Sequence, residues 1–247
     1  MSFYFKDKTW PELERLIPEQ PLVILPVGTT EEHGRHLPVG TDAMIAASFG
    51  EKLAREAEGE LPVLLMETIQ YGFSMAIVRQ WPGCPNVRTR VFMDYIRDIC
   101  SSVIVMGFKK IVVLDCHGNH DGLLRTVMRE IADEFGVYMM TLSPASLSAG
   151  VYNKIKKDPE GDIHGGEWET SWILAVDESL VNKAEYTGAD AIRCNNKLRG
   201  PVSTWCLQQT KTGLFGDPTY ASAETGEAII EAAVKAGSEY LAEFYKL

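Results

Sequence analysis

Four short runs of apolar residues alternate with longer amphipathic segments over the first 143 residues of the chain. The runs cover 22–28, 62–72, 111–118 and 137–143. The β-branched part of each run is almost continuously apolar, which is typical of strands buried on both faces of a parallel sheet. Helical patterns lie between the runs, at 41–59, 89–108 and 120–136. This order predicts an α/β fold with a mostly parallel central sheet.

The second half of the chain is less regular. It carries a helical pattern over 166–177, a loop-rich middle from 178 to 223, and a long final helix that reaches the last residue, 247. There is no internal repeat, low-complexity tract or linker-like change of composition. A chain of 247 residues is an ordinary length for one α/β domain. We therefore expect a single domain over 1–247.

Charge and composition exclude several classes of partner. Lys and Arg number 24 against 34 Asp and Glu, a formal charge of −10 with no basic run, so nucleic acid and anionic membranes are poor partners. We find no signal-peptide pattern and no stretch near the about 20 apolar residues of a membrane span. The five cysteines form no C-x-x-C pattern, which favours reduced, mostly buried thiols. We expect a soluble, cytoplasmic protein.

The segment Thr29–Asp42, "TTEEHGRHLPVGTD", directly follows the first predicted strand. It holds two of the five histidines of the chain, and Gly34, Pro38 and Gly40 interrupt any helix or buried strand there. Ligands of open α/β sheets bind beyond the carboxyl ends of the strands. The segment is therefore predicted to be a loop that carries chemistry.

Four residues at two neighbouring strand ends are candidate metal ligands. Glu31, His33 and Asp42 lie in this loop, and His117 directly follows the third strand. Imidazole combined with carboxylate suits Zn²⁺ or Mn²⁺. The alternative leaves the acids solvated, uses Asp42 only as a helix N-cap, and satisfies the histidines with backbone groups.

Three further histidines need a separate interpretation. His36 and His120 each follow a stronger candidate by three residues, and a structural role is favoured because neither loop has the helical spacing that would join such a pair. His164 begins a third cluster with Glu167 and Glu169 at a helix start, where ordinary capping is an equal alternative. Serine-nucleophile and nucleotide-binding motifs are absent from the sequence.

Together these residues resemble the creatininase family of metal-dependent amidohydrolases. The family loop reads approximately T-E-x-H-G-x-H-L-P followed by an Asp, and here it is "TEEHGRHLP" with Asp42. Further matches follow in the same order: "WPGCP" with F-P-G-T, "DCHGNHDG" with N-G-H-G-G-N, "HGGEWETS" with H-A-G-x-x-E-T-S, and "GDPTYASAETGEAII". The resemblance spans most of the chain.

The resemblance implies a flavodoxin-like fold of three α/β/α layers that assembles as a homohexamer. Glu31, His33, Asp42 and His117 would hold two Zn²⁺ or Mn²⁺ ions, with Asp42 and a hydroxide between the ions, and His164 would contact substrate and transfer a proton. The implied activity is attack on a carbonyl of a small, cyclic, polar substrate, as in a ring-opening amidohydrolase. Opening of a keto-inositol ring at a C–C bond is the alternative, and a metal-binding regulatory protein without turnover is an alternative of another class.

Departures from the family pattern bear on the second metal and on the substrate. Asn119 stands where creatininase has a ligand Glu, and Glu167 is expected to replace that acid as a ligand and catalytic residue, with Glu169 pointing elsewhere on the helix. Substrate binding is expected from a cation and aromatic rings, namely Arg79, Trp81, Trp168 and Trp205. These departures argue against creatinine itself as the substrate.

Overall fold

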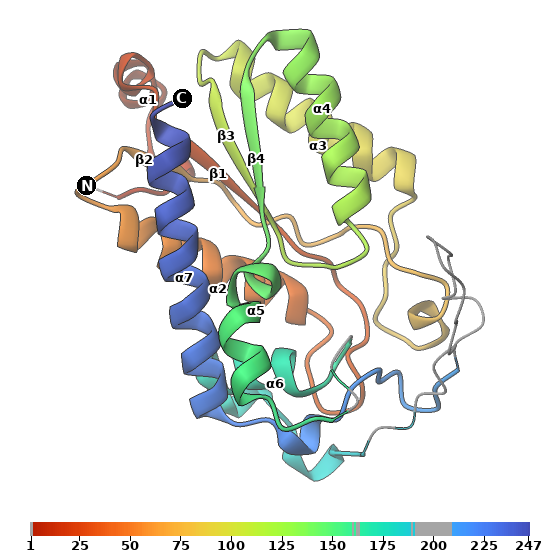
Figure 1. Cartoon of the computed structure of the whole chain (residues 1–247). Helices are drawn as coiled ribbons and strands as arrows, with labels where there is room; N and C mark the ends of the chain where they lie inside the picture. Colours follow the sequence, from red (N-terminus) through yellow and green to blue (C-terminus); the bar gives the residue numbers. More distant parts are fainter. Residues whose placement is uncertain (1, 160, 162–163, 189, 191–208) are drawn as a thin grey trace, which may run out of the picture.

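The computed structural model describes residues 2–159, 161, 164–188, 190 and 209–247. A parallel sheet of four strands in the order β2-β1-β3-β4 lies at its centre (Figure 1). The strands are β1 (Leu22–Val27), β2 (Val63–Leu65), β3 (Lys110–Asp115) and β4 (Tyr138–Leu142). The helices around them are α1 (Trp10–Leu16), α2 (Thr41–Ala57), α3 (Thr89–Val105), α4 (Asp121–Phe135), α5 (Pro144–Ile155), α6 (Glu167–Asp177) and α7 (Ala223–Tyr245).

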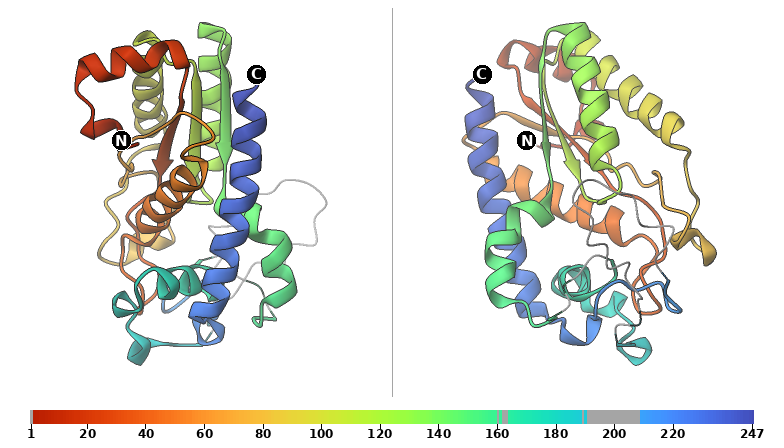
Figure 2. Two further views of the ribbon diagram at one scale, coloured as in Figure 1. Left: turned by 90° about the vertical axis from the view of Figure 1, so that its left-hand side faces the viewer. Right: turned by 45° about the vertical axis from the view of Figure 1, so that its right-hand side comes forward.

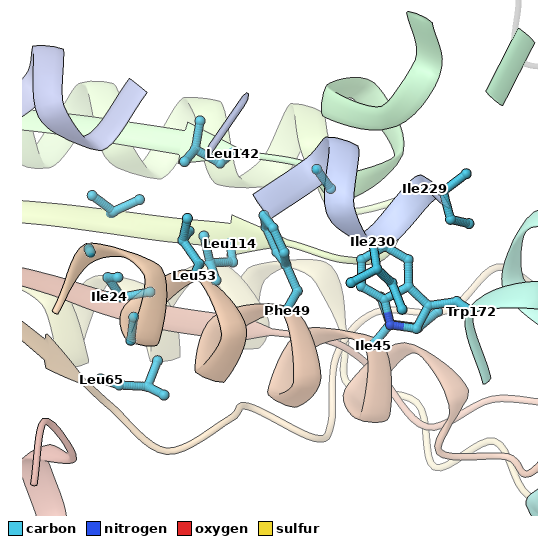
Figure 3. Close-up of a cluster of buried hydrophobic side chains, with 14 of the residues drawn as sticks. Ile24, Ile45, Phe49, Leu53, Leu65, Leu114, Leu142, Trp172, Ile229 and Ile230 are labelled. Atoms are coloured by element: carbon cyan, nitrogen blue, oxygen red, sulfur yellow. The ribbon is translucent and has the colours of Figure 1, made fainter. Parts of the chain in front are cut away.

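Each face of the sheet is covered by its own helices, which confirms the three-layer α/β/α architecture. The side chains of β1 alternate between two separate cores, with Ile24 in one and Leu25 in the other. The first core joins the sheet to α2, α6 and α7, and Phe49 and Trp172 pack edge to face inside it (Figure 3). The second core joins the sheet to α3 and α4, on the opposite side (Figure 2).

Strand β2 is much shorter than the predicted run 62–72. Beyond Leu65 the chain still follows β1, because Ile69 N–H donates to Pro26 O and bridges Val27. Leu65 pairs with Ile24, and Ile69 pairs with Val27. The chain therefore advances four residues on one side while β1 advances three, and the extra residue forms a bulge. Pro26 has no N–H to donate on this side, which interrupts the ladder where the bulge occurs.

Helices α1 and α5 were not predicted. A capping box explains the start of α1, in which the backbone N–H of Thr9 donates to Glu12 Oε2 at 2.7 Å. Helix α5 begins with Pro144 at its first position, where a missing N–H costs nothing. Its many small residues give a weak periodic pattern, and packing against α7 supplies the stabilisation that local propensity does not.

The carboxyl ends of all four strands face the lower part of the molecule in Figure 1, where α5, α6 and the connecting loops gather. Loops from β1 and β3 therefore meet here, because those strands are neighbours. Among the described residues, no helix is both long enough and apolar enough to span a membrane.

Candidate metal centre

The loop after β1 folds back on itself so that its first and last residues meet. Glu31 N–H donates to Val39 O at 2.9 Å, and Thr41 N–H donates to Pro38 O at 3.1 Å. Gly28 permits this return: a Cβ there would lie 2.6 Å from the backbone at the start of α2. The close approach sets Asp42, in the first turn of α2, beside the end of β1.

The structure brings Glu31, His33, Asp42 and His117 into one buried cluster. The two oxygens of Asp42 face different imidazoles, with Oδ1 3.2 Å from His33 Nε2 and Oδ2 2.9 Å from His117 Nδ1. His117 Nε2 lies 3.7 Å from Glu31 Oε2. His33 Nδ1 lies 3.1 Å from Glu31 O, and a carbonyl can only accept, so Nδ1 carries the proton of the neutral ring and Nε2 is the nitrogen that can bind a cation.

His164 enters the same cluster from the segment before α6. An antiparallel bridge to Phe215 fixes this segment, with Phe215 N–H donating to His164 O at 2.9 Å. His164 Nε2 lies 2.6 Å from the backbone carbonyl of Glu32, so Nε2 is the protonated nitrogen of the neutral ring. Nδ1 then faces Glu31 Oε1 at 3.6 Å. The ring is buried and lies 4.4 Å from that of His33.

Glu169 joins the cluster, whereas Glu167 does not, so the expectation for these two acids is corrected. Glu169 Oε1 lies 3.8 Å from His33 Nε2. Glu167 is fully buried, and its oxygens accept bonds from the backbone N–H groups of Lys157, at 3.0 Å, and Asp158, at 2.8 Å. The motif already held the signal for this choice, since the acid before Thr-Ser in H-A-G-x-x-E-T-S aligns with Glu169.

Among the described residues, three overlapping groups place ligand atoms within 4.8 Å of one another. They are Glu31 with Asp42 and His117, His33 with Asp42 and Glu169, and Glu31 with His33 and His164. Asp42 belongs to the first two groups. Its Oδ2 faces His117 of the first group, and its Oδ1 faces His33 of the second. A shared carboxylate of this kind can bridge two ions.

The polar atoms of the cluster fit a divalent cation. Glu31 Oε2 and His117 Nε2 are buried without a hydrogen-bond partner in the described part of the chain, and 3.7 Å between them is too long for such a bond. Four carboxylates surround the cluster, because Glu32 is also buried, with its Oε1 3.4 Å from His164 Nε2. Burying so much negative charge is costly unless cations balance it.

The pKa values of the cluster show the same electrostatics. Burial lowers the pKa of His117, but the charges of Glu31 and Asp42 outweigh burial and raise this pKa to about 9. Burial also opposes ionisation of Asp42, yet His33 and His117 hold the pKa of its carboxyl well below the usual range. Without metal the imidazoles thus carry the positive charge that the carboxylates attract. Metal binding would replace those protons.

A cavity of about 520 Å³ opens beside the cluster. Its walls include His117 and Glu169, together with Asp115, Ser143, Asn153 and Trp168. The Trp168 indole donates to Ser148 Oγ at 3.1 Å, which fixes the ring against the cavity. Small-molecule sites are commonly of this size and carry a few directed polar groups. Sequence reasoning missed Asp115, which is buried at the end of β3.

The other residues expected to bind substrate lie elsewhere. Arg79 is exposed in the short 3-10 helix η3 (Val78–Gln80), and Trp81 follows it. Neither residue lines the cavity beside the metal cluster. Trp205 lies outside the described residues.

His36 and His120 are buried, but they lie outside the three ligand groups. His36 Nε2 lies 2.8 Å from Thr170 Oγ1, and the ring packs edge to face on Tyr186. His120 stacks on Phe92 with ring centroids 4.1 Å apart. Each ring makes one hydrogen bond and packs against an aromatic neighbour, and its Nδ1 has no hydrogen-bond partner in the described part of the chain.

The fold and the centre together define a class of α/β proteins with a carboxylate–histidine cluster at the carboxyl ends of parallel strands. The family model described as creatininase, creatinine amidohydrolase, matches residues 6–241. The chain belongs to the creatininase family, whose members are hydrolases.

Relatives in this family act on different substrates. The chain is 28% identical to a 3-dehydro-scyllo-inosose hydrolase of Thermotoga maritima, over 93% of this chain and 79% of the relative. It is 27% identical to a mycofactocin precursor peptide peptidase of Mycobacterium ulcerans, over 85% and 80%. It is 23% identical to a creatinine amidohydrolase of Pseudomonas putida, over 98% and 97%.

Solved creatininases share the whole fold. A zinc–zinc form of a creatininase variant superposes with a TM-score of 0.85 at 22% identity, covering 100% of both chains. A manganese form gives a TM-score of 0.83 at the same identity and coverage. At this identity the likeness establishes the fold alone.

Proposed function

We propose that the chain is a metal-dependent hydrolase that opens the ring of a small, polar substrate by cleaving a C–N bond. One observation carries the proposal: Asp42 presents its two carboxylate oxygens to two imidazoles, His33 and His117, in a buried cluster. Family membership supports hydrolysis, and the relatives' names include amide and peptide hydrolases.

Two ligand sets would hold two ions. Glu31, Asp42 and His117 form the first set, and His33, Asp42 and Glu169 form the second, in which Glu169 takes the place expected for Glu167. The mixture of imidazole and carboxylate suits Zn²⁺ or Mn²⁺, the metals named for solved creatininases. When bound, such ions lower the pKa of water towards neutrality and polarise a carbonyl group.

The remaining residues would orient substrate and move protons. His164 has Nε2 committed to the Glu32 carbonyl, so Nδ1 is the atom free to take or give a proton beside Glu31. Trp168 offers an apolar face to a ring, and the polar groups of the cavity wall would bind its substituents. A volume of about 520 Å³ favours a small molecule over a long peptide.

A second candidate is hydrolysis of a C–C bond in a keto-inositol ring. Its support is the 28% identity to the inosose hydrolase over 93% of this chain. The cavity also suits a polyhydroxylated ring, because Asp115, Ser143 and Asn153 can each bond a hydroxyl group.

Proton release separates the two candidates. Hydrolysis of a cyclic ketone at a C–C bond yields a carboxylate and one net proton. Hydrolysis of a lactam near neutral pH yields a carboxylate and an ammonium group, which retains the proton. Purified protein with Zn²⁺ or Mn²⁺ is assayed against lactams and keto-inositols, with product detection by mass spectrometry and Asp42→Ala as the inactive control. No turnover with either class would overturn the proposal.

We also propose a closed homo-oligomer, such as a hexamer, in the cytoplasm. Large apolar side chains lie exposed on the isolated chain, among them Trp10 at 75% and Val105 at 76%. Light scattering at micromolar concentration tests the assembly, and a monomeric mass would contradict it.

A further inference from the structure

We propose that His120 is a positioning residue that fixes the loop 72–87 against the metal centre. The relevance of this loop to catalysis rests on the proposed function. The anchoring itself is a property of the protein without metal and is tested separately.

The neck of the loop is the place where Gly72 and Val87 meet. Two consecutive backbone N–H groups there, those of Gly72 and Phe73, donate to two segments that carry metal ligands. Gly72 N–H donates to Thr29 Oγ1 at 3.1 Å, and Thr29 is fully buried two residues before Glu31. Phe73 N–H donates to His120 Nε2 at 3.1 Å. The neck is closed by Val87 N–H, which donates to Gly72 O at 2.8 Å.

His120 is rigidly joined to the ligand His117. Its backbone N–H donates to His117 O at 2.9 Å in the turn after β3, and the two rings pack edge to face with centroids 4.6 Å apart. The stack on Phe92 closes the other side of the ring, which is fully buried. A Cβ at Gly72 would lie 2.4 Å from the His120 ring, so only glycine allows the loop to come this close.

The tip of the loop rests on the ligand loop. Gly83 has a φ of +105°, and a Cβ there would meet Val39 Cγ1 at 2.6 Å. Val39 is the residue whose carbonyl accepts the Glu31 N–H. Burial raises the pKa of the adjacent Cys84 thiol. The loop is thus held against the metal centre at its neck and at its tip.

The hydrogen bond from Phe73 identifies Nε2 of His120 as an acceptor. Because Nε2 accepts the Phe73 N–H, the neutral ring carries its proton on Nδ1. An apolar ring here would leave the Phe73 N–H buried without its partner.

Three variants of the full-length chain, purified without added metal, separate this role from ordinary packing. His120→Phe keeps a ring on Phe92 but removes the acceptor. His120→Gln keeps an amide oxygen near the position of Nε2 and should rescue the bond. Phe92→Leu weakens the stack and leaves Nε2 in place. Hydrogen–deuterium exchange of the peptide containing residues 73–86 is measured, with α7 as the internal reference.

We expect exchange in this peptide to become roughly three- to tenfold faster in His120→Phe, the effect of losing one hydrogen bond. His120→Gln should lie close to the wild-type rate, and Phe92→Leu should change this peptide no more than α7. Alkylation of Cys84 by iodoacetamide, followed by mass spectrometry, should accelerate in His120→Phe alone.

Unchanged exchange in His120→Phe, or equal acceleration in all three variants, would overturn the anchoring role. If His120→Phe fails to fold, slow exchange in His120→Gln still supports the role and fast exchange overturns it. Zn²⁺ stoichiometry is measured on the same samples. A wild type that binds no Zn²⁺ would refute the proposed function, and the exchange result would still decide the role of His120.

Discussion

Glu167 and Glu169 stand two positions apart on α6, yet their carboxylates bind different parts of the protein. Glu169 Oε1 lies 3.8 Å from His33 Nε2 in the metal cluster, whereas the oxygens of Glu167 accept backbone bonds from Lys157 and Asp158. Positions two apart on a helix differ in direction by about 200°. The first turn of α6 therefore directs Glu169 to the metal centre and Glu167 into the interior.

We predict that Glu169→Gln binds one divalent ion per chain in place of two, because the amide is a much weaker ligand for the second set of His33 and Asp42. Activity should fall steeply with the ion. Metal content after dialysis, measured by mass spectrometry, checks this, and two full equivalents in the variant would exclude Glu169 from the site.

Glu167→Gln is the matched control. It should keep both ions and lose stability by about 1–3 kcal/mol, because the buried N–H groups of Lys157 and Asp158 lose a charged acceptor. Urea denaturation measures the loss. An intact stability together with a missing ion would reverse the roles that the structure gives to the two acids.

Removing metal should lower the thermal stability of the protein. Glu31 Oε2 and His117 Nε2 are buried without partners in the described part of the chain, so an ion that binds only the folded state stabilises it. At 100 times its dissociation constant an ion contributes about 2.7 kcal/mol, roughly 5–10 °C in Tm for a chain of this length. Calorimetry with EDTA and with added Zn²⁺ or Mn²⁺ checks this. Asp42→Ala should fold and show no metal-dependent shift.

His164→Gln should reduce kcat by about 10²–10⁴, the usual contribution of a general acid or base. Two ions should remain, since the two ligand sets that share Asp42 do not include His164. Steady-state kinetics and metal content are measured on the same preparation. His164 also lies near Glu31 and His33, so loss of an ion would reassign it as a ligand.

His36 should make the metal-free protein sensitive to acid. Burial, followed by the charge of His33, lowers its pKa to about 4, against about 6.5 in the unfolded chain. Above pH 6.5 both states are neutral and the contribution to stability is complete. As pH falls from 6.5 towards 4 only the unfolded state gains the proton, so stability decreases by up to about 1.4 kcal/mol per pH unit.

His36→Gln keeps a hydrogen-bonding group near Thr170 Oγ1 and cannot titrate. Its free energy of unfolding should therefore depend less steeply on pH between 6.5 and 4. Urea denaturation across this range compares it with the wild-type protein, both treated with EDTA. Parallel curves for the two proteins would show that the titration of His36 is not altered by folding.

The sequence alone predicted the parallel sheet and the edge of the sheet where the candidate metal ligands gather. Apolar runs such as Leu22–Val27 can be satisfied only by burial on both faces, and the alternation with helices requires parallel strands. Ligands bind beyond the carboxyl ends of such strands, so the order of residues along the chain was enough to group Glu31, Asp42 and His117.

Tertiary structure decided which polar groups face the centre. Helical spacing alone did not separate Glu167 from Glu169, although the family motif aligns its acid with Glu169, and packing of α6 against α7 sets which carboxylate faces the centre. Helix α5 likewise depends on burial against α7, because its small residues give only a weak periodic pattern. The hydrogen bond from Phe73 to His120 joins segments 47 residues apart, and only the folded chain brings them together.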